Sequence, residues 1–353
     1  KALNGSSVKS YEAYTQTLLK NSSNLNFTGV TGSRNLPQDG NSKFEFALRT
    51  NTSGAVAQEI LVTGYQFKDH MDATYTASDG NHNAAWAGRT ESGNTVKHNK
   101  LTVKGGTLNG VGGGAYGGLV ENNKAGGTTG DAENNSLVIE GGNITKAFGA
   151  EVRTKDGSAT GNKVEITGGT MDAVSGAALT AAGATGNATN NEVKIAGGTI
   201  NGVVGGALID GGSTGNATNN TVTVEGGTVT GDLYGGFTNG SGKTTGNTVT
   251  LGDGQTALSL TFGGTIHGGA GTSSVGNTLA VHSFGAQAKD FANVQNLHFY
   301  LPAGTTAAEK RSMLTLTNTG ETNIKGLHLG VGIAGDAKAF RPGDAVSLLK
   351  VRT

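Results

Sequence analysis

The side chains best suited to bind a metal ion or to exchange a proton gather in one short stretch. They are Asp69, His70, Asp72, Asp79 and His82. Imidazole nitrogens and carboxylate oxygens are donors in zinc sites and the usual groups of acid–base catalysis. Their spacing matches no standard ligand pattern, and a solvated polar loop accounts for them equally well. The sequence therefore assigns no metal and no cofactor to this chain.

Other enzyme motifs lack the context that they need. Two Gly-x-Gly-x-x-Gly matches, at 112–117 and 330–335, have no strand–turn–helix setting for a dinucleotide. A Gly-x-Ser-x-Gly match at 211–215 lies in the variable, Gly-rich segment of a repeat, without the strand-to-helix turn that a serine nucleophile needs. These observations favour a protein that is not an enzyme.

Four aromatic side chains are the candidates for contacting a partner. They are Tyr65, Phe67, Tyr75 and Trp86, the last being the only tryptophan. Aromatic rings often anchor protein contacts. They would equally well fill the core of their own region, and this alternative stays open.

An asparagine that recurs every 27 to 36 residues organises the middle of the chain. Each copy opens a segment in which apolar and polar residues alternate, as in Asn162-Lys-Val-Glu-Ile, and this alternation is typical of a strand. A regular period of this length indicates stacked supersecondary units. The recurring residues are Asn99, Asn135, Asn162, Asn191, Asn220, Asn247 and Asn277.

The repeats predict an all-β protein, a right-handed parallel β-helix with about seven coils. Inward Val, Leu and Ile would stack on their equivalents in neighbouring coils, about 4.8 Å away. Gly pairs that follow the strands, as at 168–169, would turn the corners. The aligned asparagines would form a structural ladder of hydrogen-bonded amides.

Composition divides the chain into three regions. Residues 1–93 are richer in aromatics and are expected to form an N-terminal cap or contact module with one short helix, because Tyr14 and Leu18 share an apolar stripe. Residues 94–281 hold the Gly- and Asn-rich coils. Residues 282–353 have longer alternating strands, which we expect to form a β cap over the edge of the last coil.

The repeat and the tail together resemble the passenger domains of bacterial autotransporters, the proteins of type V secretion. The repeat is Gly161-Asn-x-Val-x-Ile-x-Gly-Gly-Thr, and the tail contains Asn296-Leu-His-Phe-Tyr-Leu-Pro, Met313-Leu-Thr-Leu and Pro342-Gly-Asp-Ala-Val-Ser-Leu-Leu. The resemblance covers the chain from about residue 94 onward and leaves 1–93 without a counterpart. It implies a parallel β-helix that is exported to the bacterial cell surface or secreted. It also implies that 282–353 is an autochaperone-like segment preceding a translocator barrel.

Charge and composition exclude several classes of partner. The 26 basic residues equal the 26 acidic ones, which is unlike the basic footprint of a nucleic-acid binder. There is no run of about 18 apolar residues, so we expect no membrane insertion of this chain. The chain starts at Lys1, lacks cysteine, and shows neither a signal peptide nor barrel strands. We therefore expect it to be the passenger alone.

The leading hypothesis is a non-enzymatic surface adhesin or a self-associating passenger. Its partner would be a host cell-surface protein or glycan, or another copy on a neighbouring cell. The first alternative is a glycan-acting lyase or hydrolase on the same β-helix. Such enzymes need charged groups on successive coils, where this sequence has mainly Gly, Thr, Asn and Ala. The second alternative is a structural display stalk.

Overall fold

The computed structural model describes residues 14–20, 34–35, 44–53, 56–110, 113–122, 129–254, 260–318, 320–334 and 341–351. Within these ranges, side chains are described from Lys68 onward, except at 260–261.

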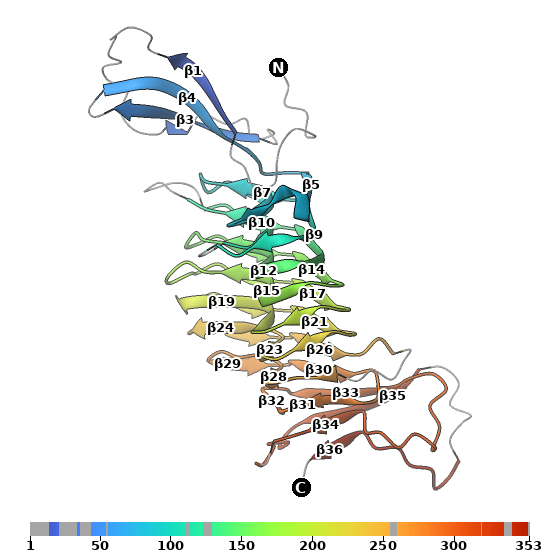
Figure 1. Ribbon diagram of the computed structural model, residues 1–353. Coiled ribbons are helices and arrows are strands. Elements are labelled where there is room, and N and C mark those ends of the chain that lie inside the picture. Colours follow the sequence, from blue (N-terminus) through green and yellow to red (C-terminus); the bar gives the residue numbers. More distant parts are fainter. Residues whose placement is uncertain are drawn as a thin grey trace.

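The described residues form an all-β protein whose parallel sheets wind into a solenoid of about eight turns, as the sequence predicts (Figure 1). Strands pair with their equivalents one repeat later. For example, β14 (Lys163–Ile166) lies parallel to β17 (Glu192–Ile195), with Val164 beside Val193. Because one coil supplies hydrogen-bond partners for the next, the coils stack as a rod.

Three parallel sheets run along the rod. The largest has 21 strands, which include β14 and β17 together with β5 (Asp72–Tyr75), β6 (Asn81–His82), β7 (Ala85–Thr90), β9 (Lys100–Leu108), β10 (Ala115–Val120), β12 (Ser136–Val152), β15 (Thr170–Leu179), β18 (Thr199–Ile200), β19 (Val204–Ser213), β21 (Thr221–Val224), β22 (Thr228–Val229), β23 (Leu233–Tyr234), β24 (Phe237–Gly240), β26 (Thr248–Leu251), β28 (Thr265–His267), β30 (Thr278–Val281), β32 (Asp290–Ala292), β33 (Asn296–Leu301) and β35 (His328–Ile333). The second consists of β8 (Val96–Lys97), β11 (Ala132–Glu133), β13 (Ala159–Thr160), β16 (Ala188–Thr189), β20 (Ala217–Thr218), β25 (Lys243–Thr245) and β29 (Ser273–Val275). The third consists of β27 (Leu260–Thr261), β31 (Ala286–Ala288), β34 (Leu314–Leu316) and β36 (Leu349–Val351).

Stacked apolar side chains fill the rod. One column aligns the same strand position in successive coils, and all its members are buried: Leu101, Leu137, Val164, Val193, Val222, Val249, Leu279 and Leu297. A second cluster is built from smaller residues such as Ala132 and Ala159 together with Val152 and Ile209. Burial of these columns supplies the main driving force for folding.

The seven recurrent asparagines form a continuous buried ladder, and each is at most 1% exposed. Asn162 shows the pattern. Its Nδ2 donates to Oδ1 of Asn191 at 3.0 Å and to the carbonyl of Ala132 at 2.9 Å. Its own oxygen accepts from the backbone N–H and from Nδ2 of Asn135, each at 3.0 Å. Both amide hydrogens and both lone pairs are therefore used, which removes the penalty for burying a polar group.

The helix expected near the start of the chain is wrong for the residues that the structure describes there. Tyr14–Lys20 is strand β1, which pairs antiparallel with β4 (Val56–Phe67). These strands, with β2 (Arg34–Asn35) and β3 (Phe44–Ser53), form a four-stranded sheet before the first coil. The stripe of Tyr14 and Leu18 fits a helix, but the pairing with β4 decides the conformation, since short apolar patterns are ambiguous. Residues 1–13 lie outside the described residues.

The coils begin earlier than the boundary expected at residue 94. Strand β5 pairs in parallel with β9, and β7 pairs in parallel with β10, so the first coil already starts after β4. A single 3-10 turn, η2 (Ala77–Asp79), interrupts it. The first coil has Met71 where later coils have the ladder asparagine, which explains why the repeat pattern missed it.

The tail continues the rod. The β cap expected at 282–353 is replaced by further parallel strands that stack on the last coil. Strand β33 pairs in parallel with both β30 and β35, and β34 pairs with both β31 and β36. Leu329, Val331 and Ile333 of β35 are 62%, 56% and 44% exposed. The described residues therefore leave this face of β35 uncovered. No helix among them is long and apolar enough to cross a membrane.

Candidate functional site

A column of aromatic rings lies outside the main core, on the coils nearest the N-terminal sheet. Trp86 of β7, Tyr116 of β10 and Phe148 of β12 occupy equivalent positions in successive coils. Tyr116 and Phe148 meet edge to face with their centroids 6.1 Å apart, and both are buried. Trp86 ends the column and is partly exposed. The column therefore offers one aromatic ring to solvent on a support that packing holds rigid.

Charged side chains from three coils run beside this column. Arg89 lies 4.4 Å from the centre of the Trp86 ring and pairs with Glu91 at 2.9 Å and with Glu121 at 2.8 Å. Arg153 pairs with the other oxygen of Glu121 at 2.6 Å. The two arginines are thus bridged by one carboxylate. Networks of this kind fix side-chain positions, because members such as Arg89 and Glu121 have more than one partner.

The buried end of the network is Glu151, whose side chain is 2% exposed. It accepts from Arg153 at 2.7 Å and from the Thr180 hydroxyl at 3.0 Å. Burial and the nearby Glu151 charge raise the pKa of Tyr116 far above its ordinary range. Burial lowers the pKa of Arg153, but the hydrogen bond and charge of Glu151 outweigh burial and raise it. Tyr116 and Arg153 therefore hold their protons more tightly than the free side chains do.

The other aromatic candidates lie elsewhere. Tyr75 is fully buried, and its hydroxyl donates to the carbonyls of Gly80 and Thr107. It fills the core, as the alternative interpretation has it, and it is not available to a partner. The side chains of Tyr65 and Phe67, in β4, lie outside the described residues.

A second group of polar and aromatic side chains lies further along the same face. Tyr234 occupies the position equivalent to Gly205 in the preceding coil and to His267 in the following one. The Tyr234 and His267 rings stack with centroids 4.5 Å apart. The Tyr234 hydroxyl donates to Asp232 at 3.3 Å, and Nε2 of His267 lies 3.9 Å from the same carboxylate. Burial raises the pKa of Tyr234 to about 12 and lowers that of His267, against the pull of Asp232.

The predicted metal or acid–base cluster assembles only in part. Asp69 and His70 lie together, and His98 from the next coil joins them, with one possible ligand atom from each residue within 4.8 Å of the others. Asp79 instead caps the η2 turn by accepting from the Thr76 backbone, and the His82 ring contacts the Asp79 carbonyl. Asp72 is exposed in β5. None of the last three belongs to the cluster that the structure forms.

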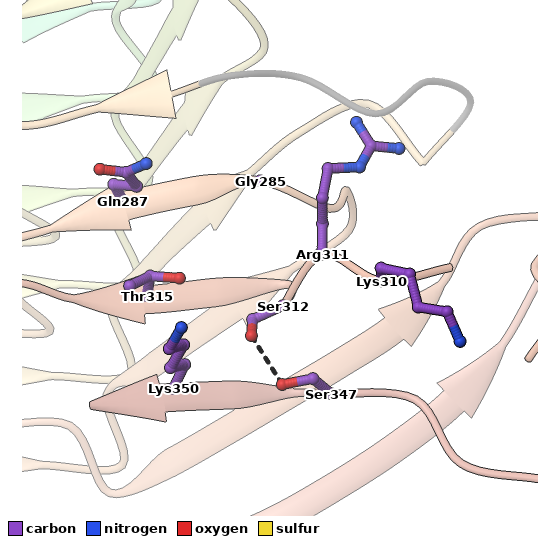
Figure 2. A pocket seen from close by; sticks show the side chains of 8 residues that line it. All are labelled: Gly285, Gln287, Lys310, Arg311, Ser312, Thr315, Ser347 and Lys350. Carbon is purple, nitrogen blue, oxygen red and sulfur yellow. Dashed lines mark hydrogen bonds between the residues drawn. The ribbon is translucent and has the colours of Figure 1, made fainter. Parts of the chain in front are cut away.

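A hollow of about 510 Å³ opens near the tail of the chain (Figure 2). Lys310, Arg311 and Lys350 make its lining basic, and the hydroxyls of Ser312 and Ser347 bond to each other across it at 2.6 Å. Arg311 is held by Glu309, and this hydrogen bond lowers the pKa of that carboxyl to about 2. The remaining lining residues are Gly285, Gln287 and Thr315. The lining contains no carboxylate, so it provides no carboxylic acid–base pair.

Sequence patterns singled out Trp86 as a candidate contact but gave no indication of Arg89, Glu121, Glu151 and Arg153. A signal was present, because Glu151 and Arg153 interrupt positions that are Ala178 and Thr180 one coil later. Charged residues at such positions could have been singled out as departures from the repeat. Their mutual contacts depend on which coils lie next to each other.

Comparison of the chain with protein-family models, with curated proteins and with solved structures found no significant match.

Proposed function

We propose that this chain is a non-enzymatic passenger of the bacterial autotransporter type. In this proposal it is a stiff rod at the cell surface, or secreted from it, that attaches to a host cell-surface protein or glycan. The observation that carries the proposal is the partly exposed Trp86 ring, which is backed by a buried aromatic column and has the Arg89 guanidinium over one of its faces. Tryptophan and arginine are frequent anchors of protein contacts, and an aromatic ring buries a large area when a partner covers it.

The electrostatics of this face support binding over catalysis. Arg89, Arg153, Glu121 and Glu151 are engaged with one another in ion pairs. A catalytic acid or base needs a pKa near the working pH, and the pKa values of Tyr116 and Arg153, the two shifted groups of this network, are raised further above neutrality. Self-association through the polar sides of the coils is the second form of the same proposal.

The experiment measures binding of the purified chain to a glycan array and to cultured epithelial cells. We expect Trp86→Ala to weaken binding by about tenfold or more, as for a central aromatic contact. Tyr300→Ala is the matched control, because this ring is also exposed, at 42%, but lies near the other end of the rod. Equal binding by the wild type and Trp86→Ala would contradict the proposed contact. Absence of binding together with concentration-dependent clumping would favour self-association.

A glycan-acting enzyme is the second candidate, and the Asp232, Tyr234 and His267 group favours it. A carboxylate, a phenol and an imidazole with a lowered pKa are groups that could move protons during glycan cleavage. Release of reducing ends from a polysaccharide by the wild type, and its loss in Asp232→Asn, would replace the adhesin proposal with this one.

A further inference from the structure

The residue before each ladder asparagine turns a corner in the left-handed conformation. The corner residues Asn134, Asn190 and Asn219 have φ values of 54°, 57° and 55°, and Gly161 and Gly246 have 68° and 67°. Glycine and asparagine are the residues that adopt this conformation most readily. The corner therefore strongly restricts which side chains are suitable.

Two consecutive corners at the start of the rod instead carry histidine. His98 precedes Asn99 with φ 56°, and His70 holds the equivalent place in the first coil with φ 54°. The equivalence follows from Met71, whose backbone N–H donates to Oδ1 of Asn99 in the position that a ladder asparagine would occupy. Because the coils stack in register, the two imidazoles lie one above the other, with centroids 4.9 Å apart.

A carboxylate completes the group. Oδ1 of Asp69 lies 2.5 Å from Nδ1 of His70 and 3.4 Å from Nδ1 of His98. The backbone holds the three residues in place, since Asp69 bridges to Lys97 and the His70 N–H donates to the Lys97 carbonyl at 3.2 Å. The His70 and His98 side chains are 54% and 41% exposed, so an ion can reach them from solvent.

We propose that Asp69, His70 and His98 bind a divalent transition-metal ion of the Zn²⁺ class. Two imidazole nitrogens and one carboxylate oxygen suit Zn²⁺, whereas Ca²⁺ and Mg²⁺ prefer sites built from oxygen alone. Three protein ligands leave a coordination position for water or for a group from a partner. The ion ties the first coil to the second, at the junction where β4 ends and the rod begins.

This arrangement predicts that the metal stabilises the N-terminal end of the rod. An ion that binds the folded state and not the unfolded state raises the unfolding temperature with its concentration. Metal binding at these three residues does not depend on what the rod contacts, so it can be present or absent whether or not the rod attaches to a partner.

The test uses the full chain without an affinity tag, treated with EDTA, dialysed and titrated with ZnCl₂ in a calorimeter. We expect one saturable site per chain and a higher unfolding temperature in Zn²⁺. His98→Asn and His70→Asn should each weaken binding by about tenfold or more. Both variants should fold, because asparagine occupies the same corner at Asn190 and Asn219. Co²⁺ in place of Zn²⁺ gives a second readout through its visible absorption, which should be lost in either variant.

The matched control is His328→Asn, which removes an exposed imidazole from β35 at the far end of the rod. It should bind Zn²⁺ like the wild type. Absence of saturable binding, or binding that is the same in the wild type and in His98→Asn, would overturn the proposal. In that case Asp69 and the two histidines form an ordinary surface ion-pair group.

Discussion

Oδ1 of Asn191 accepts two hydrogen bonds from Asn162, one from the backbone N–H and one from Nδ2, each at 3.0 Å. The two residues lie 29 positions apart in the sequence and directly next to each other in the stack. One side-chain oxygen thus fixes both the corner of the preceding coil and the register between the two coils. The same relationship repeats from Asn99 to Asn277 and ends where the Asn277 N–H donates to Gln295.

Removal of one amide from the middle of the ladder should destabilise the protein strongly. Asn191→Ala leaves two donors of Asn162 and the Ala159 carbonyl without their partners in the interior. We expect a loss of about 2–4 kcal/mol in the free energy of unfolding, since each unsatisfied buried group costs roughly 1–3 kcal/mol. Urea unfolding followed by circular dichroism measures this loss.

The control for the ladder variant is Asn187→Ala in the same coil. Asn187 is exposed, and its oxygen accepts a single bond from the Asn216 backbone. Water can replace that bond, so we expect a change of about 0.5 kcal/mol or less. Equal losses for the two variants would contradict a special role of the buried ladder.

The buried end of the ion network should be sensitive to loss of its cation. Arg153→Met leaves the Glu151 carboxylate in the interior without the guanidinium that pairs with it. We expect destabilisation by about 2–4 kcal/mol, because removing one partner of a buried pair leaves an uncompensated charge. The matched variant is Lys163→Met, since Lys163 and Glu192 pair at 2.9 Å with side chains 63% and 42% exposed. That change should cost about 1 kcal/mol or less. Thermal unfolding measures the loss of stability in both variants. A larger loss in Lys163→Met than in Arg153→Met would show that Glu151 does not depend on its pairing with Arg153.

Close stacking of the coils should exclude a methyl group at Gly176. A Cβ there would lie 2.6 Å from the Gly206 carbonyl oxygen and 2.9 Å from the Glu192 backbone nitrogen. The backbone of the neighbouring coil cannot move aside without breaking the parallel pairing. We therefore expect Gly176→Ala to lower the free energy of unfolding by about 2–3 kcal/mol. Gly320→Ala is the control, because nothing lies within 4 Å of a Cβ at that position. Equal stability of the two alanine variants in chemical unfolding would show that the coils can yield at Gly176.

Acidification should weaken the rod partly through His267. Burial lowers the pKa of its imidazole below the ordinary value of 6.5, although Asp232 and Asp290 oppose this. The unfolded chain therefore binds more protons than the folded one as the pH falls through 6.5. Stability from this group is complete at higher pH and is lost progressively on acidification.

His267→Gln should accordingly reduce the loss of stability between about pH 7.5 and about pH 5.5. Unfolding is measured in EDTA, so that no metal bound at Asp69, His70 and His98 contributes to the stability. His328→Gln, which changes an exposed side chain, should keep the wild-type dependence on pH. A steeper loss in His267→Gln than in the wild type would mean that the folded protein raises the pKa of this imidazole, contrary to the dominant effect of burial.

The sequence by itself determined the strands, their stacking and the ladder. Asparagine, alternating Val or Ile, and paired glycines recur at the same places in each unit, so a local pattern that is copied many times defines both coil and stack. At the N-terminal end the pattern was misleading, because the first coil carries Met71 in place of the asparagine and because β1 takes its conformation from its pairing with β4.

The tertiary structure alone decided which side chains meet across coils. The repeat length varies from 27 to 36 residues, so spacing in the sequence does not say that Trp86 lies beside Tyr116, or that Glu121 faces Arg153 on the outside of the rod. His98 joins Asp69 and His70 for the same reason, since it lies one coil further along the chain. Period and composition are local properties of a strand, whereas a site on a solenoid forms from single residues of several coils, and only parallel pairing in register brings them together.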